Sequence, residues 1–150
     1  MIHNKFYRHD DKNQDVNLLR NRFKEEFSSA DFRNNFSYNL VIYDDNKPVC
    51  LGRLEMKSGL FVIVGLSVDE IQQADKVRDL AVRLLIRKAA DSGAQGVYVK
   101  LSGHAEAEID FYKSFGFQLA NKNFHEEFTY YRHGDISGDC CPEKANEKKR

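Results

Sequence analysis

The first candidate for a catalytic group lies in an aromatic segment, AEIDFYKSFGFQ, residues 107–118. Tyr112 carries a phenol with an ordinary pKa of about 10, so it can donate a proton at neutral pH. Glu108 lies four residues earlier, and a helix here places both side chains on one face. The alternative is a core helix whose tyrosine hydroxyl bonds to a backbone group, since aromatic residues at helical spacing usually pack in the core.

Two cations at the start of a predicted helix, Lys76 and Arg78, form a second candidate group. A cation in the first turn opposes the helix dipole by about a few tenths of a kcal/mol unless an anion neutralises it. The pair therefore predicts either a site for an anionic ligand or neutralisation by Asp75, Asp79 and solvent.

The overall composition excludes several classes of partner. The 23 Lys and Arg balance 23 Asp and Glu, so no net field favours nucleic acid or an acidic membrane. No apolar run reaches the roughly 20 residues of a membrane span, and the first residues lack a signal-peptide core, so a cytoplasmic protein is expected. Cys50, Cys140 and Cys141 do not form a paired framework, so reduced thiols are expected and no metal site is predicted.

Hydrophobic periodicity divides the chain into strands and helices. Helices are predicted over residues 15–27, with Asp15 as a cap, over 75–92, ending before Gly93, and from 107 to a stop at Gly116. Strands are predicted over 3–9, 38–43, 49–56, 59–68, 96–103, 115–120 and 128–133. Residues 44–48, DDNKP, are typical of a turn between antiparallel strands.

This order predicts an α+β fold in three layers (α/β/α). The long helix between strands 59–68 and 96–103 is a crossover that should make those strands parallel, whereas the hairpins add antiparallel strands. A mixed, mostly antiparallel sheet with flanking helices follows. The 150 residues suit one domain, expected over 1–133, with a polar C-terminal tail over 134–150 that lacks periodicity.

The element order, with LGRLEM (51–56) in an early hairpin and EIDFYKSFGF (108–117) near the end, resembles the GNAT superfamily of acyl-CoA-dependent N-acetyltransferases. The resemblance covers residues 2–133 and implies a splayed parallel strand pair in the sheet. In that family, the tyrosine at the position of Tyr112 commonly lies near the coenzyme thiol and returns a proton to it. The resemblance implies the same role for Tyr112.

The resemblance also implies where acetyl-CoA, the expected co-substrate, is held. The family's pyrophosphate loop, (Q/R)xxGx(G/A), falls on Gln73, Ala74, Asp75, Lys76, Val77 and Arg78. Lys76 and Arg78 replace the two small residues that allow close backbone approach to the diphosphate, so they either block the coenzyme or bind its phosphates directly. Backbone groups of Leu66, Ser67 and Val68 are the other expected contacts.

Amine acetylation needs a group that takes a proton from the amine. Many relatives carry an acidic residue on the central strand, but LFVIVGLSV (60–68) has none. Glu55 on the neighbouring strand and Glu108 on the late helix are the candidate bases, with His104 a third. For each there is an alternative: Glu55 at the sheet edge or facing solvent, Glu108 on a solvent face, and His104 in a loop or cap.

The sequence is therefore compatible with two functions. One is an N-acetyltransferase that transfers the acetyl group of acetyl-CoA directly to an amine of a small molecule or protein. The alternative is a GNAT-like binding or regulatory module that has lost catalysis. The segments expected to select the acceptor, 15–37 and 121–131, carry both signs of charge and indicate no acceptor class. A homodimer is left open.

Overall fold

The computed structural model describes residues 1–8, 12–28, 36–57, 59–102, 106–120 and 128–134, with only the backbone for 102 and 128–131. It divides into two compact units, Met1–Leu85 and Ile86–Arg150, which we describe separately. The predicted tail over 134–150 lies outside the described residues apart from Gly134, so the predicted domain boundaries stay a prediction.

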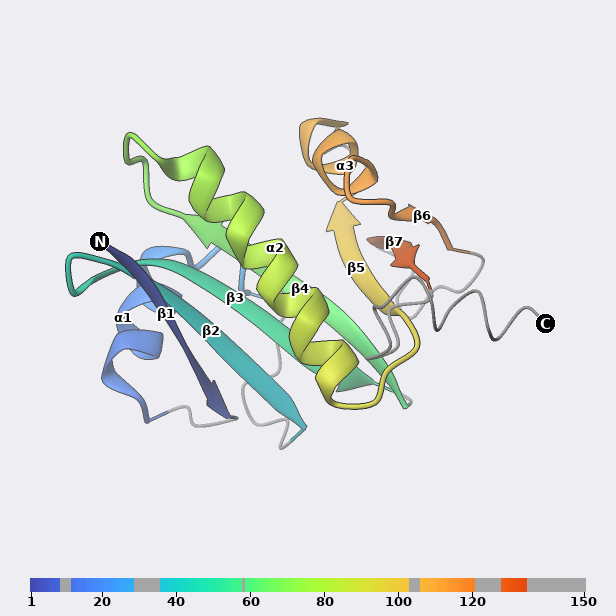
Figure 1. The fold of residues 1–150 in the computed structure, drawn as a ribbon, viewed down its shortest axis with the longest axis horizontal. Helices are drawn as coiled ribbons and strands as arrows, with labels where there is room; N and C mark the ends of the chain where they lie inside the picture. The colour runs from blue at the N-terminus through green and yellow to red at the C-terminus, as the bar shows by residue number, and fades with distance from the viewer. Residues whose placement is uncertain (9–11, 29–35, 58, 103–105, 121–127, 135–150) are drawn as a thin grey trace, which may run out of the picture. The chain divides into compact units, whose positions relative to one another are not determined.

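The first unit contains four consecutive antiparallel strands (Figure 1). They are β1 (Ile2–Arg8), β2 (Ser37–Asp44), β3 (Lys47–Lys57) and β4 (Leu60–Val68). The predicted hairpin turn is confirmed between β2 and β3, where Asp45 and Asn46 have φ angles of 50° and 70°. Asn and Asp are the non-glycine residues that best tolerate this left-handed conformation, which a two-residue hairpin requires.

Helices α1 (Gln14–Arg22) and α2 (Ala74–Asp91) lie on opposite faces of this sheet (Figure 1). Leu51 of β3 packs in the core cluster that contains Val16 and Leu19 of α1. Its neighbour Gly52 points the other way, because strand residues alternate, and a Cβ there would lie 3.0 Å from Cδ1 of Leu85 in α2. Gly52 thus lets α2 pack closely on β3.

The start and end of α1 differ from the prediction. Asn13, rather than Asp15, is the cap, because its Oδ1 accepts a hydrogen bond of 3.0 Å from the Val16 N–H. Asp15 instead accepts a hydrogen bond of 2.7 Å from the Tyr43 hydroxyl. The helix ends at Arg22, and residues 23–28 form turns that carry Phe27 into the core, where it is 3% exposed.

The second unit contains β5 (Val97–Ser102), α3 (Glu106–Lys113), β6 (Gln118–Leu119) and β7 (Phe128–His133). Strand β7 pairs antiparallel with both β5 and β6. Gly116 has a φ of 104°, which a side chain would strain, and it lies between the end of α3 and β6 as predicted. Gly93, after α2, has a φ of 93° and is confirmed as the other predicted stop.

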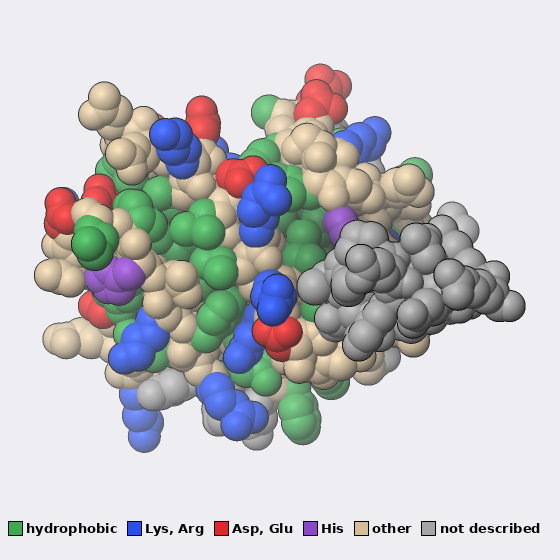
Figure 2. Space-filling model, in the orientation of Figure 1, with side chains coloured by type: hydrophobic (Ala, Val, Ile, Leu, Met, Phe, Trp, Pro, Cys, Tyr) green, Lys and Arg blue, Asp and Glu red, His purple; other side chains and the backbone are tan. Residues whose placement is uncertain are grey.

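The exposed side of α2 carries charges of both signs. Figure 2 shows basic and acidic side chains next to each other over this helix, and two pairs lie four residues apart: Arg83 with Asp79 at 2.8 Å and Arg87 with Asp91 at 3.2 Å. Such exposed pairs contribute little to stability, because solvent and salt screen them. Within the described part of the chain, no helix is long and apolar enough to span a membrane.

A polar layer is buried on the α1 face of β2 and β3. The Arg53 guanidinium is fully buried and donates to Glu55 Oε2 at 2.6 Å, to Asn39 Oδ1 at 2.7 Å and to Ser37 Oγ at 3.0 Å. Glu55 is also fully buried, and the Lys57 ammonium approaches its Oε1 at 3.7 Å. Arg53 therefore joins three other polar residues, each of which would be costly to bury alone.

We predict that Arg53→Met destabilises the protein by about 3–5 kcal/mol, because it leaves the buried Glu55 carboxylate without its guanidinium. Urea unfolding monitored by circular dichroism measures the change. The double variant Arg53→Met/Glu55→Leu should recover part of this loss, since it removes the uncompensated charge. A single variant within about 1 kcal/mol of the wild type would contradict the assigned role, because exposed ion pairs show changes of that size.

Candidate functional site

Strand β4 contains one residue more than its partner. Arg53 lies opposite Gly65 and Leu54 lies opposite Ile63, so Val64 is the extra residue of a β-bulge. A bulge interrupts the ladder, increases the twist and redirects the groups that follow, and bulges are frequent next to active sites. The bulge directly precedes residues 66–68, which were predicted to contact the coenzyme.

The backbone amide of Leu66 is bonded to a side chain from a distant segment. Its N–H donates to Glu26 Oε2 at 3.1 Å, across 40 residues of sequence. In an antiparallel pair, the N–H groups alternate between the two edges of a strand, so this group lies outside the ladder that β4 forms with β3. An amide that leaves the ladder beside a bulge can hold an acceptor oxygen of another molecule.

The turn that carries Glu26 is fixed over the end of β4 by two contacts. The ring of Phe27 covers Gly65 so closely that a Cβ at Gly65 would lie 2.6 Å from Phe27 Cε1. The Arg22 guanidinium forms an ion pair with Asp69, the residue after β4. The position of Glu26 is therefore set by its neighbours on both sides.

A pocket of ≈ 570 Å³ opens between this turn and the end of β4. It is lined by Asn21, Arg22, Phe23, Lys24, Glu25, Glu26 and Ser67. Within the described part of the first unit, this lining brings together two carboxylates, two cations and the end of a bulged strand. Such a pocket can hold a polar ligand and exchange a proton with it.

The predicted coenzyme residues lie on both sides of the β4–α2 connection. Leu66 is buried, and Ser67 and Val68 are half-buried at the end of β4. Gln73 precedes α2, while Ala74, Asp75, Lys76, Val77 and Arg78 belong to its first turns. The motif positions are thus mostly helical, and the first turn of a helix contains backbone N–H groups that have no partner within the helix.

The expected neutralisation of the two cations is partly correct. Arg78 Nη1 lies 3.5 Å from Asp75 Oδ1, but Asp79 is paired with Arg83 rather than with Lys76 or Arg78. Lys76 is exposed on the helix surface. Because the Arg78–Asp75 pair is exposed, an anionic ligand could displace it at small cost.

Glu55 is neither at the sheet edge nor facing solvent, so that alternative is wrong. It lies on β3, between β2 and β4, with no exposed surface and one carboxylate oxygen held by Arg53. A carboxylate in this position contributes to the buried polar layer. Its geometry is unfavourable for taking a proton from an amine that arrives from solvent.

Tyr112 and Glu108 share helix α3 in the second unit but differ in burial. Tyr112 is 4% exposed, and its ring meets Phe111 and Phe117 edge-on at centroid distances of 5.2 and 5.3 Å. Glu108 is exposed, which agrees with the alternative of a solvent face at that position. His104 and Ala105 lie outside the described residues.

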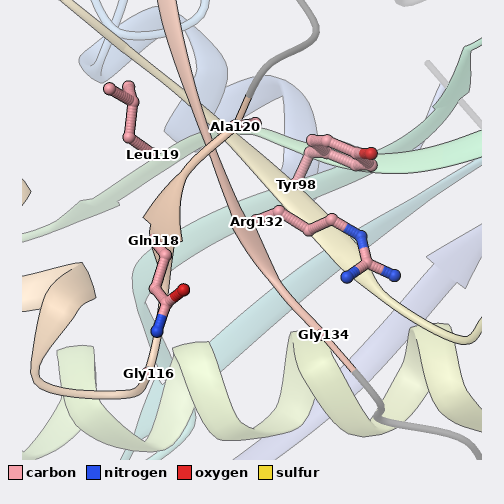
Figure 3. A pocket seen from close by; sticks show the side chains of 7 residues that line it. All are labelled: Tyr98, Gly116, Gln118, Leu119, Ala120, Arg132 and Gly134. Carbon is pink, nitrogen blue, oxygen red and sulfur yellow. The ribbon is translucent and has the colours of Figure 1, made fainter.

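A second pocket, of ≈ 580 Å³, lies within the second unit (Figure 3). It is lined by Tyr98, Gly116, Gln118, Leu119, Ala120, Arg132 and Gly134. The side chains of Tyr98 and Arg132 extend to the same side (Figure 3), with the guanidinium carbon 5.9 Å from the ring centroid. This described lining contains neither a carboxylate nor a histidine, so it offers no base, and the pocket beside Glu26 is the better candidate site.

Cysteine and metal chemistry find no support in the described residues. Burial raises the pKa of the Cys50 thiol to about 12, so the thiol is protonated at neutral pH and is a poor nucleophile. No group of His, Cys, Asp and Glu within the described ranges could hold a metal ion. Cys140 and Cys141 lie outside those ranges.

Sequence reasoning missed both Glu26 and the bulge at Val64. Glu26 lies in a stretch that was predicted to be helical, and its sequence neighbours give no sign of a partner in β4. No local pattern marks Val64 as the extra residue of a bulge either, since LFVIVGLSV is apolar throughout its first seven residues. Only the pairing of β3 with β4 reveals it.

Comparison with known proteins gives one sequence relative and several structural ones. No protein-family model matches the chain. The uncharacterized N-acetyltransferase YjcF of Bacillus subtilis is 33% identical over 91 residues, which cover 60% of this chain and 63% of that relative. The match therefore spans slightly less than two thirds of the relative's length.

The structural likeness extends over nearly the whole chain. An N-acetyltransferase from Staphylococcus aureus Mu50 has a TM-score of 0.70 at 16% identity, covering 91% of this chain and 98% of that one. An acyl-CoA N-acyltransferase from Pseudomonas aeruginosa has a TM-score of 0.66 at 15% identity, covering 89% and 100%. These likenesses confirm the predicted α+β class, with a mixed sheet, flanking helices and one parallel strand pair. The chain therefore has the fold of the GNAT superfamily, as its sequence resemblance predicted.

Proposed function

We propose that the protein is an N-acetyltransferase that transfers the acetyl group of acetyl-CoA to an amine by direct attack. The similarity to YjcF and to the N-acetyltransferase of Staphylococcus aureus supports the transferase activity. The similarity to the acyl-CoA N-acyltransferase of Pseudomonas aeruginosa supports an acyl-CoA co-substrate. Fold alone does not determine function, so the proposal depends on the chemistry of the site.

The observation that carries the proposal is the Leu66 N–H, which lies outside the ladder between β3 and β4, beside a bulge and a pocket. An N–H fixed in a strand can donate to a thioester carbonyl oxygen and stabilise the negative charge that develops there when the amine attacks. Such a donor needs no reorganisation during the reaction, because the strand already holds it. Ser67 and Val68 continue the same strand and are proposed to bind the adjoining part of the coenzyme.

The start of α2 is the proposed site for the coenzyme diphosphate. Its first-turn N–H groups and the positive end of its dipole favour an anion, and Gln73 and Ala74 stand at that end. Lys76 and Arg78 add two cations where the family has small residues. We propose that they contact the phosphates directly, with Arg78 leaving its exposed pair with Asp75.

Tyr112 is the proposed acid. After the amine nitrogen bonds to the carbonyl carbon, the C–S bond breaks and the thiolate of CoA receives the hydroxyl proton of Tyr112. The tyrosine recovers a proton from the nitrogen, so the charges balance. The edge-on packing of Tyr112 between Phe111 and Phe117 limits its rotamers, as a positioned acid requires.

A second function, a GNAT-like module that has lost catalysis, is favoured by two observations. Arg78 already pairs with Asp75 on the same helix, and β4 carries no carboxylate. In that case the coenzyme either binds without turnover or does not bind. Titration with acetyl-CoA and turnover measurements distinguish the two functions, because only the transferase both binds the coenzyme and turns it over.

We predict that the wild-type protein binds acetyl-CoA and that Lys76→Ala/Arg78→Ala weakens binding by roughly tenfold or more per cation, since each charged hydrogen bond is worth about 1.5–3 kcal/mol. Isothermal titration calorimetry measures both dissociation constants. Alanine keeps the helix intact, so the variant tests the charges alone.

The matched variant Lys76→Gly/Arg78→Gly tests the backbone instead. If it binds acetyl-CoA more tightly than the alanine variant, then backbone approach matters at these positions despite the lower helix propensity of glycine. Absence of binding by the wild type, with binding gained in the glycine variant, would contradict the proposal and favour a module closed to coenzyme.

We predict that Tyr112→Phe lowers kcat by about 100-fold or more, because a positioned general acid contributes about 10²–10⁴-fold. The phenyl ring keeps the packing with Phe111 and Phe117, so acetyl-CoA affinity and thermal stability should change little. Release of CoA from acetyl-CoA, followed with a thiol reagent in the presence of an amine, measures kcat. Unchanged kcat would assign Tyr112 to the core alone.

A further inference from the structure

We infer that Glu26 is the general base that takes the proton from the acceptor amine, which gives the site the carboxylate that β4 lacks. This inference rests on the proposed function. Glu26 Oε2 lies 3.1 Å from the Leu66 nitrogen, the proposed donor to the acyl carbonyl. A group that reaches this amide is within a few ångströms of the carbon that the amine must attack.

The turn holds Glu26 in this place by contacts on either side of it. Phe27 is buried against Gly65, which leaves no room for any side chain at that position. Arg22 is paired with Asp69 immediately after β4. The backbone of the turn adds a hydrogen bond of 3.3 Å from the Phe27 N–H to the Phe23 carbonyl. These contacts fix the backbone of the turn and so place the Glu26 carboxylate next to β4.

The Glu26 carboxylate occupies the Leu66 N–H, so it must move when acetyl-CoA binds there. The thioester carbonyl oxygen needs the same N–H, so its binding moves the Glu26 carboxylate aside. The glutamate side chain can swing by rotation about its own bonds, whereas its backbone is held by Phe27 and the Arg22–Asp69 pair. The displaced carboxylate then lies in the pocket beside the acyl group, where the acceptor arrives.

The proton transfers balance with Glu26 in this role. The carboxylate removes one proton from the ammonium form of the acceptor and gives a neutral amine, whose nitrogen attacks the carbonyl carbon. The second proton leaves the nitrogen for the departing thiolate through Tyr112. Glu26 returns its proton to solvent through the open pocket, and the net products are the amide, CoA and one proton.

Other carboxylates of the first unit are less suited to this role. Glu55 has no exposed surface and is bound to Arg53, and Asp69 is paired with Arg22. Glu25 lines the same pocket but is exposed. Two cations, Arg22 and Lys24, share the pocket lining with Glu26.

The test compares the wild type with Glu26→Gln, which keeps the size and the hydrogen bond to Leu66 but cannot act as a base. Acetyl-CoA binding is measured by calorimetry, and turnover is measured with a polyamine, an arylalkylamine and a peptide with a free N-terminus. We expect binding to persist and kcat/KM to fall by about 100-fold or more at pH 7. In the variant the rate should rise steeply with pH, because only bulk solvent then deprotonates the amine.

A matched control is Glu106→Gln, the same change at an exposed residue of α3 outside the pocket lining. It should match the wild type, and Glu26→Asp should recover part of the activity. If Glu26→Gln folds, binds acetyl-CoA and turns over like the wild type at every pH, Glu26 is not the base although the proposed function stands. If the wild type neither binds acetyl-CoA nor acetylates any of the three amines, the proposed function fails and the inference fails with it.

Discussion

The extra residue Val64 in β4 is the constraint on which the candidate site depends. Without it, the register of β3 with β4 would continue unchanged, and a shift of one residue would turn the side chains after it to the opposite face of the sheet. With the bulge in place, Gly65 faces α1 and accepts the ring of Phe27, while the Leu66 N–H leaves the ladder. The pocket, the turn over it and the position of Glu26 all follow from this local change of register.

The same contact explains why α1 is shorter than its hydrophobic pattern predicts. Continuing the helix to residue 27 would satisfy the spacing of Val16, Leu19, Phe23 and Phe27, yet the chain leaves helical geometry at Phe23. The turns of 23–28 place Phe27 against Gly65 and Glu26 against Leu66. Tertiary packing of one aromatic ring thus outweighs the few tenths of a kcal/mol per residue by which helix propensities differ.

Most of the elements could be predicted from sequence because their signals are local. The apolar spacing of α2, the turn at Asp45 and Asn46, and the stops at Gly93 and Gly116 each depend on a few adjacent residues. The bulge and the bond between Glu26 and Leu66 depend on pairing between strands and on contact across 40 residues. No periodicity encodes these contacts, so the candidate site was predicted only where the family resemblance extended.

Glu26 and Glu55 show why residue type alone does not identify a base. Both lie on the α1 face of the sheet, but Glu55 is fully buried with Arg53, whereas Glu26 is half-buried at a pocket. Glu55 has no exposed surface, and its Oε2 accepts a hydrogen bond from the buried Arg53 guanidinium, so an amine from solvent does not reach it. Glu26 accepts a hydrogen bond from the Leu66 amide and lines a pocket from which solvent can take a proton away. The surroundings of Glu55 therefore suit a structural role, whereas those of Glu26 suit proton exchange.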